Sequence, residues 1–214
     1  MARVPISATR RLELVQAAYD AVKESGFRGY ALEEVARHAG TAKGTIHHYF
    51  LNKEELIDEV VKYVNRALSQ TILDMIKAAK SPSERLWSII SVNLSEEYFS
   101  PIIARSYTVG TAIAIRYPHL LRIYDAVQVR TISNLAFALR QLARPEDVRP
   151  TAYTIWTMIE GAWLLQATQE EETATSTLRI LADYLKNAVP GFDTSVIRNL
   201  DHFPKSPTPS HNRT

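Results

Sequence analysis

The sequence predicts an all-α protein of about nine helices. Three observations support this fold class: only 7 of the 214 residues are glycine, the alternation typical of strands is hard to find, and apolar residues recur at spacings of three and four. The composition is that of a globular chain, with 46% hydrophobic and 22% charged residues. A chain of this length can bury a sizeable hydrophobic core.

Apolar stripes and glycines mark the expected helices at the start of the chain. Gly26 is a suitable residue just beyond the first helix, and Gly40 ends the second. The stripe of the first helix consists of Leu12, Val15, Tyr19 and Val22. We expect these helices over residues 7–25, 32–39, 43–50 and 53–79.

Prolines divide the remainder of the chain. Pro82 suits the first position of a fifth helix, whose apolar residues extend to Tyr98. Pro101 and Pro118 mark the next boundaries. Residues 191–214 are rich in Pro, Ser, Thr and Asn and are expected to form a flexible tail. The later helices are expected over residues 103–116, 119–143, 146–168 and 175–189.

Charge and cysteine content exclude several classes of protein. The formal net charge is only +2, which argues against a histone-like or polybasic membrane-binding chain. Residues 1–53 nevertheless hold eight basic and five acidic residues, a local charge of +3. The absence of cysteine excludes disulfides and thiol catalysis and fits a reducing cytoplasm. Residues 151–168 include Glu160 and several threonines, so they do not predict a membrane span.

A tight helix-turn-helix is predicted between Leu32 and Leu51. Ala36 is small at a place where two helices must cross closely, Gly40 supplies the turn, and Ile46 faces inward from the next helix. The second helix of such a unit can enter the major groove of DNA. A helical hairpin in an all-α protein is the alternative reading of the same pattern.

Outward residues of this helix and its neighbours are suited to DNA. Lysine can contact phosphate or guanine, and threonine can contact a base edge. Lys53 begins the following helix, where backbone N–H groups would also face a phosphate. The predicted DNA-binding residues are Arg10, Arg11, Thr41, Lys43, Thr45, His47, His48, Tyr49 and Lys53, with Arg3 on the preceding arm. Adjacent histidines on a helix point about 100° apart, so His47 and His48 are not expected to form a metal site. No cofactor is expected.

The run GTAKGTIHHYFLNKEELIDEVV, residues 40–61, resembles the recognition helix and following helix of the tetracycline-repressor (TetR) family. The resemblance implies a nine-helix chain with a three-helix DNA-binding head and a dimerising, effector-binding body. We therefore expect a DNA-binding domain at 1–52, a body at 53–190 and the tail at 191–214.

Three positions depart from the family pattern. Ala31 and Ala42 stand where members usually have a capping Ser or Thr, and a missing cap costs roughly 1 kcal/mol. Either Thr41 is a substitute cap or the caps are absent. His47 replaces a tyrosine that commonly contacts phosphate, and a protonated histidine can do the same.

A carboxylate among aromatic residues is the strongest signal in the body. Glu160 lies between Trp156 and Trp163 at helical spacing, and a lone buried carboxylate is costly. Its partner is either a group on another helix or a cationic ligand, which tryptophan and tyrosine faces attract. The candidate effector-binding residues are Trp87, Tyr98, Tyr107, Tyr117, Trp156, Glu160 and Trp163.

A second resemblance concerns the body. Residues 118–135 and the run IEGAWLLQA, residues 159–167, are similar to the choline-responsive repressors of betaine synthesis, a TetR subgroup. The resemblance favours a cationic or amine effector. Helix 146–168 is apolar on two faces, so we expect one face to pack inside the subunit and the other to meet a partner subunit. Helix 175–189 is expected to join it in the interface of a twofold homodimer.

These observations predict a dimeric, cytoplasmic repressor that a small-molecule effector releases from double-stranded, pseudo-palindromic operator DNA, by a shift of the helix at 53–79. Two alternatives remain: a regulator of a neutral hydrophobic ligand, and a helical interaction protein with a degenerate head. An enzyme is not expected, because the chain contains no Ser-His-Asp spacing, no H-E-x-x-H and no Gly-rich phosphate loop.

Overall fold

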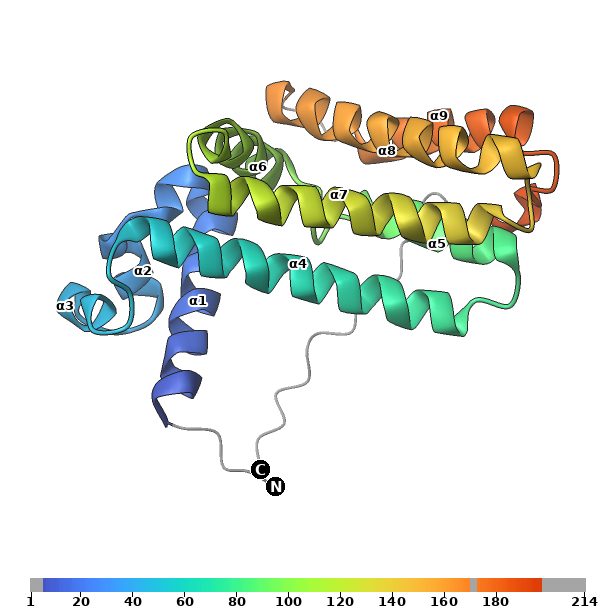
Figure 1. The fold of residues 1–214 in the computed structure, drawn as a ribbon. Helices are drawn as coiled ribbons and strands as arrows, with labels where there is room; N and C mark the ends of the chain where they lie inside the picture. Colours follow the sequence, from blue (N-terminus) through green and yellow to red (C-terminus); the bar gives the residue numbers. More distant parts are fainter. Residues whose placement is uncertain (1–5, 170–172, 198–214) are drawn as a thin grey trace.

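The computed structural model describes residues 6–169 and 173–197, and all regular secondary structure in this part of the chain is helical. It contains nine α-helices and two short 3₁₀ helices, which confirms the predicted fold class (Figure 1). The helices are α1 (Ile6–Ser25), η1 (Gly26–Tyr30), α2 (Leu32–His38), α3 (Lys43–His47), α4 (Lys53–Ala78), α5 (Pro82–Asn93), α6 (Pro101–Ala114), α7 (Pro118–Leu139), α8 (Pro145–Thr168), α9 (Ala174–Ala188) and η2 (Thr194–Val196).

Local capping explains where α4, α5 and α6 begin. The side chains of Asn52, Ser81 and Ser100 each accept a hydrogen bond from the backbone N–H three residues further on. The two short helices of the head have no such bond, because their N-caps are Ala31 and Ala42. Thr41 is therefore not a substitute cap, and the starts of α2 and α3 depend on packing.

The head has its own core, formed where α1, α2, α3 and the start of α4 meet. One correction concerns α1: Leu12 is 50% exposed, whereas Leu14 is fully buried. Val15 and Val22 of the predicted stripe are buried and Tyr19 packs against the same core, so only Leu12 is wrong. The buried residues of this core include Leu14, Val15, Ala18, Val22, Tyr30, Val35, Ala36, Ile46, Phe50, Leu56 and Val60.

The larger core lies in the body, between α5, α7, α8 and α9. The leucine stripe of α9, formed by Leu178, Leu181 and Leu185, is fully buried in this core of the same chain. Helix 175–189 was expected at a dimer interface, but its leucines are thus used inside the subunit. On the outer side of α9, Ile180 is the large apolar residue that is exposed, at 61%.

Two predicted boundaries differ from the structure. The fifth helix ends at Asn93, and the turns that follow it still bury Leu94 and Tyr98. The predicted tail does not begin at residue 191, because Phe192 is buried and the backbone N–H of Asp193 donates to Ser83 Oγ of α5 at 3.0 Å. The remainder of that tail, 198–214, lies outside the described residues.

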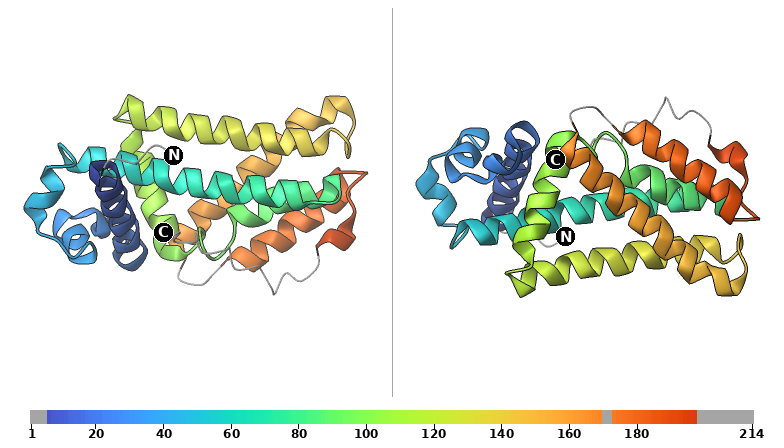
Figure 2. Two further views of the ribbon diagram at one scale, coloured as in Figure 1. Left: turned by 90° about the horizontal axis from the view of Figure 1, so that it is seen from below. Right: turned by 90° about the horizontal axis from the view of Figure 1, so that it is seen from above.

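The head lies at one end of the molecule, and α4 extends from it along the body (Figure 1). The two further views show α8 and α9 on the side of the body away from α4 (Figure 2). Within the described ranges, no helix is both long and apolar enough to span a membrane.

Candidate functional site

The short helix α3 presents a polar outer face. Ile46 is 1% exposed and anchors the helix in the head core, while Lys43, His47 and His48 are exposed. The turn before it is made by Gly40 in the left-handed region, at φ +59°. A helix held in this way on its inner side can enter a DNA groove with its outer side.

Several predicted DNA-binding cations are already paired with carboxylates of the head. Lys43 Nζ lies 2.5 Å from Glu33 Oε1, and Arg10 lies 2.6 Å from Glu13. Both pairs are exposed, so each contributes little to stability and can be exchanged for a phosphate contact. Arg3 lies outside the described residues.

Arg11 has a different place from the one predicted. Its guanidinium pairs with Glu55 at 2.7 Å and with Glu59 at 3.1 Å, both on α4, and it lies 4.7 Å from the centroid of the Phe50 ring. Its Nε also donates to the Tyr49 carbonyl at 3.4 Å. Arg11 therefore joins α1 to the end of the recognition unit and to α4, a structural role that the sequence did not indicate.

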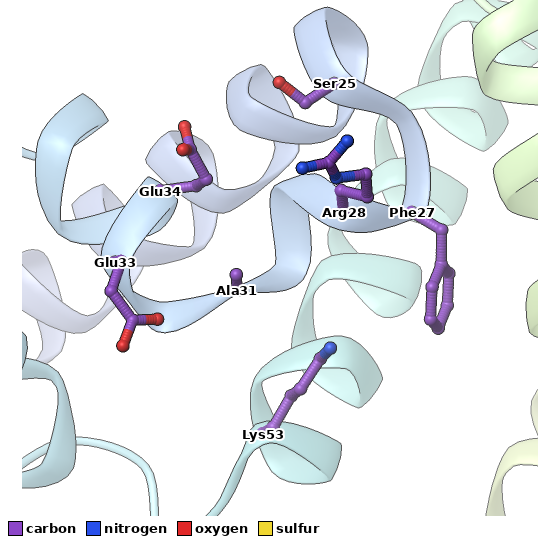
Figure 3. A pocket seen from close by; sticks show the side chains of 7 residues that line it. All are labelled: Ser25, Phe27, Arg28, Ala31, Glu33, Glu34 and Lys53. Carbon is purple, nitrogen blue, oxygen red and sulfur yellow. The ribbon is translucent and has the colours of Figure 1, made fainter.

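A hollow of about 630 Å³ lies beside the start of α2. Arg28 of η1 and Lys53 of α4 enter it from opposite sides (Figure 3). Lys53 Nζ also lies 5.3 Å from the centroid of the Phe27 ring. Glu33 and Glu34 of α2 line the same hollow, so its two cations are matched by two carboxylates (Figure 3). Lys53 was predicted to contact DNA.

A second cavity, of about 120 Å³, lies inside the body and reaches the head. This volume is well above what a single water molecule requires. Five of the seven predicted effector residues line it, contributed by α6, α8 and the turn after α5: Tyr98, Tyr107, Trp156, Glu160 and Trp163. We call it the inner cavity.

The other two predicted residues do not line the inner cavity. Trp87 packs against the body core, and Tyr117 is 37% exposed at the start of α7, with its ring 6.0 Å from that of His119. Helical spacing indicated which residues of α8 share a face, but it could not show which neighbouring aromatic residues turn toward that face.

Glu160 is the charged group of the inner cavity. The Tyr107 hydroxyl donates to its two carboxylate oxygens at 3.1 and 3.2 Å, and the Tyr107 ring lies 4.9 Å from the Trp163 ring. In the described part of the chain, no lysine or arginine forms an ion pair with Glu160. Burial raises the pKa of this carboxyl above its ordinary value, although the Tyr107 hydrogen bond partly opposes the shift.

Head residues complete the wall of the inner cavity, and sequence reasoning missed them as site residues. Tyr19 of α1 and Phe27 and Tyr30 of η1 line it, beside Tyr124 of α7. The Tyr19 hydroxyl is buried without a hydrogen-bond partner. A cavity bounded by these aromatic rings and one carboxylate can hold a small organic cation.

The outer face of α8 is apolar and exposed. Tyr153, Leu164 and Leu165 are each more than half exposed. Ile180 of α9 is also a large apolar residue that is exposed to solvent. Scattered exposed leucines are common, but several large apolar residues on one helix face indicate an interaction surface.

Comparison with known proteins adds two family matches. Residues 14–60 match the model described as "Bacterial regulatory proteins, tetR family", and residues 82–190 match "BetI-type transcriptional repressor, C-terminal". The HTH-type transcriptional regulator BetI of Klebsiella pneumoniae (strain 342) is 28% identical over 169 residues, which cover 78% of this chain and 87% of that protein.

Solved structures share the fold. A putative transcriptional regulator from Saccharomonospora viridis in complex with choline superposes with a TM-score of 0.75 at 15% identity, over 85% of this chain and 98% of that one. A TetR transcription regulator from Haloarcula marismortui gives the same TM-score at 16% identity, over 85% of this chain and 99% of the other.

Proposed function

Because the chain belongs to the TetR family and carries a C-terminal domain of the BetI-type transcriptional repressors, we propose that it is a dimeric repressor released from its operator by a small cationic ligand. Its membership makes it a DNA-binding transcriptional regulator and not an enzyme. The observation that carries the ligand proposal is Glu160, a partly buried carboxylate among aromatic rings without a cationic partner in the described chain.

The exposed face of α3 supports the DNA half of the proposal. In a twofold dimer, two copies of this helix read half-sites about one DNA turn, roughly 34 Å, apart. The apolar outer face of α8, with Tyr153, Leu164 and Leu165, supports a dimer interface, and Ile180 supplies the contribution of α9.

The aromatic rings around Glu160 support a cationic effector. Their faces carry negative electrostatic potential and attract ammonium groups, above all when water is excluded. The carboxylate accepts a hydrogen bond from Tyr107 of α6, and binding of such a ligand would add the cationic partner that it lacks in the described chain. The choline found in the Saccharomonospora viridis structure agrees with this chemistry.

The inner cavity also supports a route from ligand to DNA. Tyr19 and Val22 of α1 and Phe27 and Tyr30 of η1 belong to the head, yet they line the cavity together with α4 residues. A ligand that displaces these rings moves the elements that hold α2 and α3. Release requires only that the ligand bind the DNA-incompetent arrangement more tightly than the competent one.

A DNA-binding experiment tests the first half. Fluorescence anisotropy with the DNA upstream of the chain's own gene should show binding that weakens on Lys43→Ala, because the exposed Lys43 contacts the DNA. Lys186→Ala, on the exposed side of α9, is the matched control and should bind as the wild type does. Binding without sequence preference or steep salt dependence would favour an interaction protein with a degenerate head.

A ligand experiment tests the second half. Calorimetry with choline and with 3,3-dimethylbutanol, its neutral isostere, separates charge from shape. We expect choline to bind and to release the DNA, while the isostere does neither. Equal binding of the two would support a regulator of neutral hydrophobic ligands and contradict the cationic effector.

A further inference from the structure

A third cavity, of about 310 Å³, adjoins the inner cavity on the side of α7. We call it the outer cavity. Five residues line both cavities: Phe27, Ile57, Val61, Gly110 and Tyr124. The two spaces therefore share a wall made by η1, α4, α6 and α7, and a molecule in one can extend into the other where that wall opens.

The chemistry of the outer cavity differs from that of the inner one. Beyond the shared wall it is lined by Ile113, Tyr117 and Leu120, which are apolar or aromatic. Its charged residues are Lys53, Arg116 and the exposed Glu54, so cations outnumber carboxylates two to one. Such a space favours an apolar chain or ring and repels a second ammonium group.

Gly110 and Tyr124 meet in the wall between the two cavities. A Cβ at this position would lie 2.9 Å from Tyr124 Oη, closer than real Cβ contacts allow. The Tyr124 hydroxyl thus packs directly against the Gly110 backbone, and a ligand tail crosses the wall here when the Tyr124 ring turns aside. The Tyr124 ring in turn lies edge-on to Tyr107, with 5.6 Å between ring centroids, and Tyr107 holds Glu160.

We propose that the effector is an amphiphilic monocation, whose ammonium group lies beside Glu160 in the inner cavity and whose alkyl or aryl tail passes Gly110 into the outer cavity. The inference rests on the proposed cationic effector and adds its shape and polarity. A small ammonium compound fills the inner cavity alone, whereas the tail gains the burial of apolar surface against Ile113 and Leu120.

A series of alkyltrimethylammonium ions tests this inference. Calorimetry below the critical micelle concentration compares tetramethylammonium with the butyl and octyl compounds. Each additional buried methylene is expected to tighten binding by up to about fourfold. An octyl chain that carries a second trimethylammonium group at its far end is expected to bind more weakly than the octyl monocation, because Lys53 and Arg116 oppose the second charge.

Variants distinguish the tail site, which is the outer cavity, from the head-group site, which is the inner cavity beside Glu160. Ile113→Trp fills the outer cavity without lining the inner one, so it should remove the gain from the tail and leave tetramethylammonium binding unchanged. Val109→Trp adds the same bulk on the outer side of α6, away from both cavities, and should keep the gain. Circular dichroism of both variants checks that they fold.

The outcomes separate the two proposals. If tetramethylammonium binds but longer chains bind no more tightly, the tail site is wrong and the cationic effector stands. An equal gain from the tail in Ile113→Trp and the wild type would also overturn the tail site. If no member of the series binds, the cationic effector itself fails, and the tail site fails with it.

Discussion

Replacing Glu160 by glutamine separates a ligand-binding carboxylate from a structural one. Glutamine keeps the shape of the side chain, and its carbonyl oxygen still accepts the hydrogen bond that Tyr107 donates. Only the negative charge is lost. If the charge exists for a cationic effector, the variant loses effector affinity but not stability.

The size of the loss can be estimated from the site. Two unit charges about 4 Å apart attract by about 4 kcal/mol at an effective dielectric constant of about 20. Desolvation of the cation and partial exposure of Glu160 offset about half of this or more. A remaining difference of about 1.4 to 2 kcal/mol corresponds to roughly 10- to 30-fold weaker binding.

The pH dependence has a definite sign. Burial raises the pKa of Glu160, so between its ordinary value and this raised value the folded chain holds a proton that the unfolded chain has lost. The free energy of unfolding therefore falls as the pH rises through that window. A cationic ligand needs the ionised carboxylate, so its affinity should rise with pH over the same window. Both slopes should disappear in Glu160→Gln.

Two measurements check this reasoning. Calorimetry with choline or tetramethylammonium gives the affinity, and thermal unfolding without ligand gives the stability. We expect a weaker affinity together with an unchanged or higher melting temperature. A variant that melts earlier and binds the cation as tightly as the wild type would refute the argument, because Glu160 would then be a structural residue.

Three further changes have expected outcomes. Gly29→Ala places a Cβ 2.3 Å from the Ala21 carbonyl, so the free energy of unfolding should fall by at least about 2 kcal/mol in thermal unfolding. Gly44→Ala is the control, because its Cβ meets nothing within 4 Å, and its free energy of unfolding should not fall. Arg11→Ala should lower the melting temperature by removing two ion pairs to α4, and an unchanged value would contradict its structural role. Leu165→Arg should shift the sedimentation coefficient from dimer to monomer, and a dimer that persists would move the interface elsewhere.

Local signals were sufficient to predict most of the fold. Pro82, Pro101 and Pro118 each begin a helix in the structure, and Gly26 adopts the left-handed conformation, at φ +61°, directly after α1. The fifth helix was predicted too long because apolar spacing continued to Tyr98. In the structure, turns bury those residues just as a helix would, so the pattern alone could not locate the end.

The residues that line the inner cavity could be predicted where they lie on one helix, but not where different helices bring them together. Trp156, Glu160 and Trp163 share a face because of their spacing, and the structure places all three at the inner cavity. Phe27 could not be found in this way, since it reaches the cavity from the head through the packing of η1 against α6. The role of Arg11 was equally hidden, because its carboxylate partners lie more than forty residues later in the chain.

The pairing of head cations with carboxylates bears on how strongly the chain attracts polyanions in general. Free of DNA, the charge of Lys43 is balanced by Glu33, and that of Arg11 by Glu55 and Glu59. Such pairing weakens the field that would draw any polyanion to the head. We therefore expect discrimination among nucleic acids to depend on the contacts that α3 makes with base edges rather than on charge alone.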